Sequence, residues 1–456
     1  MRWKPVENDS VHESTQGFPA HAYVKSLRIG LTVVGFVASC GAAASSEVAG
    51  WPRLLEAAPA PFSVASDALA RSGAIESTVP HGADGAALTE SMLQWTEHAL
   101  RLVQKHLQNP QRAVRSLALL HAVMHDAFVV AAREDTGTAG GAVAAHRAAS
   151  LMLAYLYPYE PENWIEGKGL LLAYGWGRAL GAGDAAMRRA LAIGERVAAD
   201  GMARAVADGA DRRNPMARPP DSGPGRWRAT PPINVHTPQE ALAGEWRPWS
   251  AASLEVRAPP PPEYGSERFW RDAEEVYRVW QKLSPSQKGI AEQWNLQAGS
   301  ATPPGVWNQR ALELLRGTKP DAPHAVRVLA VLNAAMNDAA IVCWRTKYEW
   351  WVVRPVSVIR ERFDPQFLPH LVTPPHPSYT SGHSSVSGAA EVALAAFFPG
   401  RRAELHAMAE EAAMSRLYGG IHYRSDNEEG LALGRRVAEV VVERAIRPDQ
   451  RAGASP

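Results

Sequence analysis

The stretch AVRSLALLHAVMHDA at residues 113–127 returns as AVRVLAVLNAAMNDA at residues 325–339, with ten of fifteen positions identical. In both copies apolar residues recur three and four positions apart, which is the spacing of one face of an α-helix. A helical unit that occurs twice indicates an internal duplication. The repeat therefore predicts two related helical bundles that pack about a pseudo-twofold axis.

Two polar positions of the repeat change together between the copies. His121 and His125 lie four residues apart on one helix face, where two imidazoles could bind a metal ion. Asn333 and Asn337 replace them in the second copy. Because a carboxamide keeps hydrogen bonding, we interpret all four positions as buried hydrogen-bonding sites.

Helical periodicity outside the repeat predicts an all-α protein. No window shows the alternation of apolar and polar residues that is typical of a β-strand. The apolar spacing predicts helices at 89–107, 112–133, 142–156, 184–207, 266–282, 285–296, 306–316, 323–345, 383–397, 401–417 and 426–446.

A proline-rich segment separates the two helical regions. Residues 215–262 contain twelve of the 35 prolines, so this segment is not helical. We interpret it as an ordered crossover held on the surface by Trp227, Trp246 and Trp249, with a disordered linker as the alternative. The predicted organisation is a signal or lipoprotein segment at 1–45, an irregular arm at 46–87, a first bundle at 88–214, a crossover at 215–263, a second bundle at 264–448 and a tail at 449–456.

The amino-terminal segment predicts export. Basic residues precede a ten-residue apolar stretch at 29–38, which is too short to span a bilayer and has the length of a signal-peptide core. The sequence VASC at 37–40 is typical of a lipoprotein box with a lipid anchor on Cys40, whereas AAA at 42–44 would suit ordinary cleavage. We therefore expect a periplasmic or cell-surface lipoprotein, or a secreted protein.

The charge balance argues against a nucleic-acid or membrane-surface footprint. Lys and Arg number 48 against 47 Asp and Glu, so the chain has no net field of either sign. No transmembrane helix is expected after the signal segment. Any anion site must be built locally.

Three clusters in the second half carry groups that bind oxyanions. In the first, KYEWWVVRP, Lys347 and Arg354 are seven residues apart, so a continuous helix would place both cations on one face. Pro355 should place Arg354 near the end of that helix. A solvated helix face is the alternative for such a pair.

The second cluster is HPSYTSGHSS at 376–385, which leads into an Ala-rich apolar run. Ser381, Gly382 and His383 would occupy the start of this buried helix. Free backbone amides and the positive end of the helix dipole favour an anion there. Simple N-capping would explain the serine alone.

The third cluster is SRLYGGIHYRSDNEEG at 415–430. It predicts that one helix ends at the glycine pair and that another begins near Ser425 with a capping box. His422 lies between them, and Asp426 can accept from one of its ring nitrogens and leave the other free as ligand or nucleophile. Arg416 supplies a third cation.

Together the three clusters resemble the signature shared by the vanadium-dependent haloperoxidases and the PAP2-type acid phosphatases. One departure is Thr380, which stands where that signature usually has proline and should change turn stiffness more than chemistry. The resemblance extends over about residues 88–446 and implies a fold like that of the vanadium chloroperoxidases.

In the haloperoxidase branch, the resemblance implies a vanadate cofactor with His422 as the vanadium ligand. His383 would then act as acid and base, Lys347 would polarise hydrogen peroxide, and halide would be oxidised to hypohalous acid. The residues that would hold the oxo groups are Lys347, Arg354, Ser381, Gly382 and Arg416.

In the phosphatase branch, the same pocket would hold phosphate: His422 would attack phosphorus, and His383 would protonate the leaving alcohol. The length and the repeat favour the haloperoxidase, because soluble PAP2-type phosphatases resemble a single bundle of about half this length. An inactive lipoprotein that merely binds an oxyanion is the third alternative.

Two further residues indicate which halide the site would prefer. Trp344 matches a tryptophan at the halide side of fungal chloroperoxidases, and His376 matches a histidine of algal bromoperoxidases, which favours bromide or iodide. A core tryptophan and a supporting histidine are the alternatives. The organic acceptor stays open, and exposed apolar helix faces would suit a homodimer.

Overall fold

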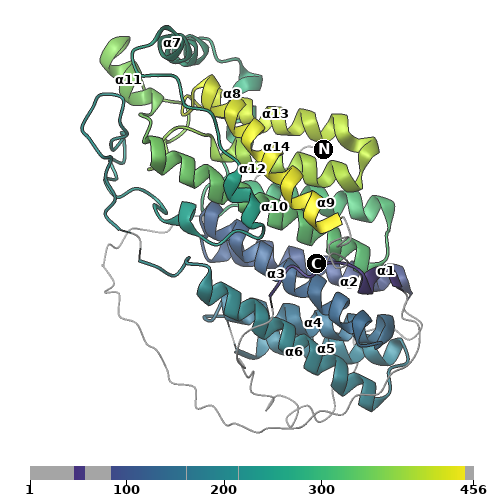
Figure 1. Cartoon of the computed structure of the whole chain (residues 1–456). Helices are drawn as coiled ribbons and strands as arrows, with labels where there is room; N and C mark the ends of the chain where they lie inside the picture. Colours follow the sequence, from purple (N-terminus) through teal and green to yellow (C-terminus); the bar gives the residue numbers. More distant parts are fainter. Residues whose placement is uncertain (1–45, 57–83, 161, 214, 447–456) are drawn as a thin grey trace, which may run out of the picture. The chain divides into compact units, whose positions relative to one another are not determined.

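The computed structural model of the chain describes residues 46–56, 84–160, 162–213 and 215–446 (Figure 1). Across these residues the regular structure is helical, without a strand, and one isolated bridge joins Arg226 to Val352. The prediction of an all-α protein is therefore confirmed. The predicted signal segment with Cys40, the tail at 449–456 and much of the arm lie outside the described residues.

The first half of the chain is a group of long helices. α4 packs against α3, α5 and α6, so it is the centre of this group. α5 was not anticipated, because its glycines and aromatic residues interrupt any apolar stripe. The helices are α1 (Ser46–Ala49), α2 (Gly85–Lys105), α3 (Pro110–Arg133), α4 (Gly137–Leu156), α5 (Glu162–Ala179) and α6 (Asp184–Ala207).

The proline-rich crossover contains two short 3-10 helices, η2 (Ala243–Glu245) and η3 (Ala251–Glu255). Trp227, Trp246 and Trp249 are all buried. The guanidinium of Arg204 lies 3.8 Å from the ring centre of Trp249, and that of Arg112 lies 4.9 Å from that of Trp246. Aromatic packing and cation–π contacts therefore hold this irregular segment on the helices.

The second half carries the longest helix of the described chain, α10. It packs against α3 of the first half and against α12 and α14 of its own half (Figure 1). The helices are α7 (Glu267–Gln281), α8 (Pro285–Gln293), α9 (Thr302–Thr318), α10 (Ala322–Trp350), α11 (Pro355–Arg362), α12 (Gly382–Phe397), α13 (Arg402–Tyr418) and α14 (Arg424–Ile446), with the 3-10 turn η4 (Pro399–Arg401).

The two copies of the repeat are the contacting helices α3 and α10. His121 in α3 donates from Nδ1 to Leu117 O at 2.7 Å and contacts the Thr96 hydroxyl through Nε2 at 2.9 Å. Its counterpart Asn333 bonds Asn308 at 2.8 Å. These positions are therefore hydrogen-bonded core sites between the halves, as the carboxamides of the second copy indicated.

The repeat ends in an aspartate that holds an extended segment in each half. Asp126 accepts from the backbone amides of Leu54 and Leu55, both at 2.9 Å. Asp338 accepts from those of Trp249 and Ser250 at 2.7 and 2.9 Å. Equivalent residues thus perform equivalent tasks, which is what a duplicated unit predicts.

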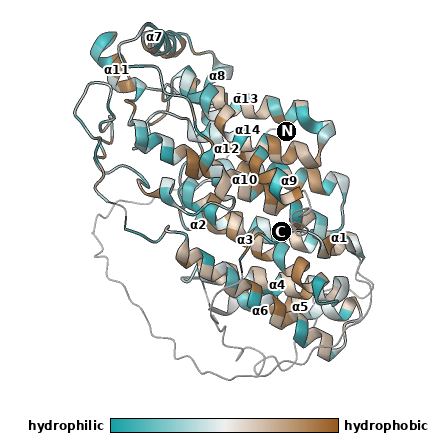
Figure 2. Cartoon of the chain, in the orientation of Figure 1, coloured by the Kyte–Doolittle hydropathy of each residue, from teal (hydrophilic) through white to brown (hydrophobic). Residues whose placement is uncertain are grey.

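α3 and α10 are long and apolar enough to cross a membrane by composition alone. In each helix 94% of the most apolar window is buried inside the protein. Figure 2 shows hydrophobic residues along α10 where neighbouring helices cover it. These helices are therefore the centre of a folded core, and their apolar character has a packing explanation.

Glycines bring α12 and α14 into close contact. A Cβ at Gly434 would lie 1.9 Å from Ser385 O, and a Cβ at Gly388 would lie 2.4 Å from Leu431 O. A Cβ at Gly430 would lie 2.9 Å from Ser381 O. This close approach fixes the start of α12 against α14, and the candidate site lies at that point.

Candidate active site

Lys347 and Arg354 do not share a helix. α10 ends at Trp350 because Trp351 adopts a left-handed conformation with φ 52°, and Arg354 is the extended residue before α11. The prediction of one continuous helix face is therefore wrong. The cations meet on a loop instead: Lys347 Nζ donates to Pro377 O at 2.8 Å, and Arg354 Nε donates to His376 O at 2.8 Å.

The start of α12 presents three candidate residues. Ser381 is the N-cap, and its hydroxyl accepts from the amide of Ser384. Gly382 packs against Trp344, since a Cβ there would lie 3.0 Å from the indole. His383 Nε2 lies 3.0 Å from Trp294 O, which can only accept, so this nitrogen carries the proton and Nδ1 is left as an acceptor.

His422 is held between a carboxylate and a guanidinium. Its Nδ1 donates to Asp426 at 2.8 Å, and its Nε2 lies 3.1 Å from Arg354 Nη1. Because a guanidinium only donates, Nε2 is unprotonated and keeps a lone pair. Asp426 also accepts from the Ser378 hydroxyl at 2.6 Å and from the Tyr423 amide at 3.1 Å.

The same aspartate explains where α14 begins. The sequence predicted a helix start near Ser425, and α14 begins at Arg424, which confirms it. Asp426 accepts the amide of Tyr423 before the helix, so the carboxylate that orients His422 also binds the helix start. The orientation of His422 and the start of α14 therefore depend on one side chain.

Buried positive charge dominates the site. Lys347, Arg354 and Arg416 are fully buried, and the carboxylate among them is Asp426. Burial lowers the pKa of Lys347 to about 7, that of Arg354 to about 10 and that of Arg416 to about 9. Three cations against one carboxylate favour a multiply charged anion.

The histidines are neutral near pH 7. Burial is the main cause that lowers the pKa of His376, His383 and His422 well below 6.5, and the neighbouring cations lower it further. Burial also raises the pKa of Asp426 to about 6. The site therefore holds unprotonated imidazole nitrogens beside cations.

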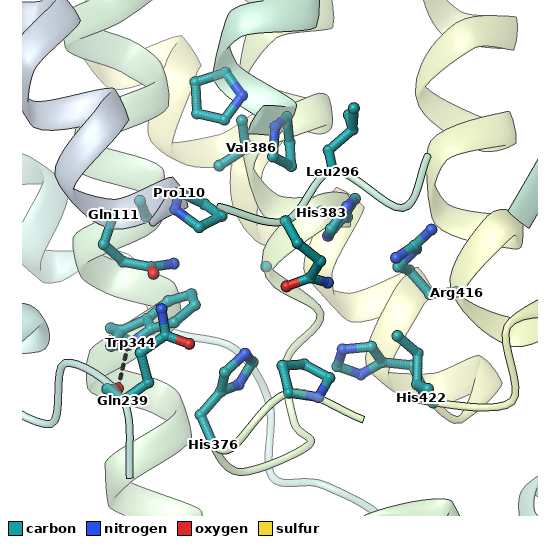
Figure 3. Close-up of a pocket in the computed structure, with 17 residues that line it drawn as sticks. Pro110, Gln111, Gln239, Leu296, Trp344, His376, His383, Val386, Arg416 and His422 are labelled. Carbon is teal, nitrogen blue, oxygen red and sulfur yellow. Dashed lines mark hydrogen bonds between the residues drawn. The ribbon is translucent and has the colours of Figure 1, made fainter. Parts of the chain in front are cut away.

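A cavity opens between the start of α12 and the turn before α14 (Figure 3). Its volume of about 50 Å³ is several times the room that one water needs. Gly382, His383, Arg416 and His422 line it, together with Trp344 and His376, whose ring centres are 5.0 Å apart. Lys347, Arg354, Ser381 and Asp426 lie behind these lining residues.

Arg416 has a free donor at this cavity. Its Nη2 donates to Ala291 O at 3.2 Å and its Nε to the Ser415 hydroxyl at 2.9 Å, but Nη1 is buried and has no hydrogen-bond partner in the described part of the chain. A buried unpaired donor is costly, so this atom indicates an oxyanion ligand.

The first half of the chain supplies one wall of the cavity. Pro110 and Gln111 at the start of α3 and Gln239 of the crossover line it. Sequence reasoning missed these residues, because no local motif marks a glutamine whose role depends on contacts between distant segments. The proline at the start of α3 predicted only a helix terminus.

Residues 327–445, which contain most of these groups, match the PAP2 superfamily. The match covers about a quarter of the chain. The chain is also similar to a bacterial vanadium-dependent iodoperoxidase, at 26% identity with a TM-score of 0.67 over 78% of this chain and 96% of that one. The departure Thr380 therefore lies inside an otherwise matching PAP2 region.

Two further relatives support the same PAP2 fold. A holo-type bacterial vanadium-dependent chloroperoxidase aligns with a TM-score of 0.56 and 15% identity, over 75% of this chain and 92% of that one. The vanadium chloroperoxidase of Curvularia inaequalis is 28% identical over an alignment of 146 residues that covers 26% of this chain and 24% of that protein. The chain thus has the fold of the vanadium haloperoxidases.

Proposed function

We propose that the protein is a vanadate-dependent haloperoxidase that oxidises bromide or iodide with hydrogen peroxide to hypohalous acid. The observation that carries this proposal is a cavity lined by the buried Arg416 and by His422 with its unprotonated nitrogen, with the buried cations Lys347 and Arg354 behind this lining. The likeness to a bacterial iodoperoxidase along 78% of the chain supports the halide preference.

The residues present fit vanadate. The unpaired Nη1 of Arg416 offers a donor, His422 Nε2 offers a lone pair, and the lining contains no carboxylate that would repel an anion. We assign His422 as the metal ligand, with Lys347, Arg354, Arg416, Ser381 and the Gly382 amide as the groups that would hold the oxo atoms. When bound, vanadate would supply a Lewis acid that activates hydrogen peroxide.

The side chains would divide the remaining work. His383 is neutral and presents Nδ1 as an acceptor, because Trp294 O holds its Nε2 proton, so it can take a proton from hydrogen peroxide. Burial lowers the pKa of Lys347 to about 7, so near pH 7 its charged form can bind a negatively charged oxygen and can also donate a proton to it. Asp426 keeps His422 in one tautomer.

The direct test is halide oxidation by the purified chain with hydrogen peroxide, with and without orthovanadate. We expect activity with bromide and iodide only after vanadate is added, and metal analysis should find about one vanadium bound per chain, as one such cavity predicts. Vanadium-loaded protein that oxidises neither halide would overturn the proposal.

A PAP2-type phosphatase is the second candidate. The unprotonated Nε2 of His422, held by Asp426, is also the geometry of a nucleophile for phosphoryl transfer, and His383 would then protonate the leaving alcohol. Hydrolysis of para-nitrophenyl phosphate separates the candidates, because vanadate should inhibit hydrolysis and activate halide oxidation.

A further inference from the structure

Gln111 is a buried amide without a partner. It lies at the second position of α3, and only 6% of its surface is exposed. Its side chain makes no hydrogen bond to any residue in the described ranges of the chain, and it lines the cavity. Figure 3 shows it extending into the cavity from the side opposite to Arg416 and His422. An amide that faces a cavity without a protein partner is available to a ligand there.

A network of hydrogen bonds fixes this wall. Glu240 accepts from Asn109 at 2.9 Å and from Arg112 at 2.7 and 2.9 Å, so it binds the start of α3. The backbone carbonyl of its neighbour Gln239 accepts from Trp344 Nε1 at 3.3 Å and from the Tyr348 hydroxyl at 2.6 Å. The start of α3 is therefore connected rigidly to the Trp344 face of α10.

The chemistry of this wall suits a monatomic, weakly hydrated anion. Gln111 offers amide protons at the positive end of a long helix. His376 Nδ1 lies 3.0 Å from Arg354 Nη2 and 3.2 Å from Pro377 O. Because the nearer guanidinium always donates, Nδ1 accepts from it, and Nε2 carries the proton and is a second donor. The other groups around the cavity include Pro110, Leu296, Pro303, Pro304 and Val386, which are apolar.

We propose that Gln111, supplied by the first half of the chain, binds the halide and determines the affinity of the site for it. This inference rests on the proposed haloperoxidase function. Hydrogen-bond donors on one side of the cavity and apolar or aromatic surfaces on the other suit bromide and iodide. These large halides lose less hydration energy than smaller halides do when they enter such a cavity.

The test compares Gln111→Leu with the full-length parent protein. Leucine keeps the approximate volume and removes the donors. We expect the KM for bromide to rise roughly tenfold, as for one lost hydrogen bond to an ion, with kcat at saturating bromide and the KM for hydrogen peroxide unchanged. The broadening of the bromide NMR signal by vanadate-loaded protein without peroxide should fall in parallel.

Two further variants complete the design. Gln111→Glu places a carboxylate in the wall and should raise the KM for bromide more than leucine does, by repulsion. Gln104→Leu, on an exposed face of α2 outside the cavity, is the matched control and should leave KM and line broadening at parental values.

Each result has one meaning. If the parent oxidises bromide but Gln111→Leu and Gln111→Glu keep its KM and line broadening, the halide role of Gln111 is wrong while the proposed function stands. A rise in the KM for peroxide alone would also overturn it. A parent that is inactive with vanadate refutes the proposed function, and bromide broadening that still depends on Gln111 would then support a halide site independently.

Discussion

The His422 imidazole is fixed by one acceptor and one donor, Asp426 and Arg354, so the direction of its Nε2 lone pair, which accepts from Arg354, is set by its neighbours. A histidine without such neighbours would rotate and exchange tautomers. The orientation costs nothing at the moment of ligand binding, because the protein has already established it on folding. Pre-organisation of this kind supports tight anion binding.

His422→Ala tests this residue directly. Loss of the nitrogen ligand should weaken orthovanadate binding by roughly a hundredfold, since even a supporting partner of a metal ligand contributes ten- to a hundredfold. Calorimetric titration measures the change. His370→Ala, which removes an imidazole bonded to Glu292 away from the cavity, is the control and should bind like the parent.

Lys347 predicts a pH dependence of anion binding. Burial lowers its pKa to about 7, so the lysine is charged below that pH and neutral above it, whereas a bound anion raises its pKa. Affinity should therefore be full below about pH 7 and fall by up to about tenfold per pH unit above it. Asp426, with a pKa of about 6, is already charged there, and the three site histidines are already neutral.

Tungstate is the suitable probe, because its charge is constant over this range. Its dissociation constant, measured by calorimetry from about pH 7 to about pH 8.5, should rise with pH in the parent and stay nearly flat in Lys347→Met. The upper limit avoids the titration of Arg416 at about 9. The same slope in both proteins would show that Lys347 is not the titrating group.

At the scale of elements, the contact of α12 with α14 depends on glycine. A Cβ at Gly434 would lie 1.9 Å from the backbone oxygen of Ser385, so Gly434→Ala must push the helices apart. We expect a loss of about 1–3 kcal/mol of unfolding free energy, the range for overpacked cores. Chemical denaturation measures it, and weaker vanadate binding should accompany it, because the displaced α12 carries Ser381.

Gly289→Ala is the matched control for this prediction. Gly289 lies on α8, and a Cβ there would meet nothing within 4 Å. This substitution should leave stability unchanged or raise it slightly, because alanine is the better helix former. An equal loss of unfolding free energy in Gly434→Ala and Gly289→Ala would contradict a specific role for the close contact between α12 and α14.

Strong periodicity made most helices predictable, and the failures have physical causes. α11 is eight residues long and too short for a periodic pattern, and it was missed. The continuous helix through Lys347 and Arg354 failed at Trp351, since a left-handed tryptophan is unfavourable in isolation and depends on tertiary contacts. Trp351 packs its ring against Trp227 of the crossover, 6.1 Å between centres.

The candidate site was predictable where its groups are close in sequence. Ser381, Gly382 and His383 at a helix start, and His422 with Asp426, follow from local spacing. Gln111 was not predictable, because α3 reaches the cavity only through its packing with α10 and the crossover. Local motifs therefore pointed to the side of the cavity that His383 and His422 line, and tertiary structure was needed for the opposite wall.

At the scale of the whole molecule, the halves share one hydrophobic core. A single buried cluster includes Leu117 and Met124 of α3 together with Leu332 and Met336 of α10. Removing the first half would expose this face of α10 to water. The region that matches the PAP2 superfamily, residues 327–445, thus depends for its packing on helices outside it.

A fragment limited to residues 264–456 should accordingly fail to form a rigid native state. Exposure of the α10 face removes several buried aliphatic contacts, each contributing about 1.5–3 kcal/mol, which exceeds ordinary domain stability when summed. Near-UV circular dichroism and dye binding should report a loosely packed state. A fragment with the parental near-UV spectrum and a cooperative thermal transition would contradict the shared core.

The repeat offset of 212 residues superimposes α3 on positions 322–345, yet α10 continues to Trp350. Lys347 lies in this additional turn, which the first copy lacks. The second copy of the repeat therefore extends one helical turn further than the first, and this turn carries Lys347. Shortening α10 by this turn would remove Lys347 from the site but leave the part of α10 that corresponds to α3 intact.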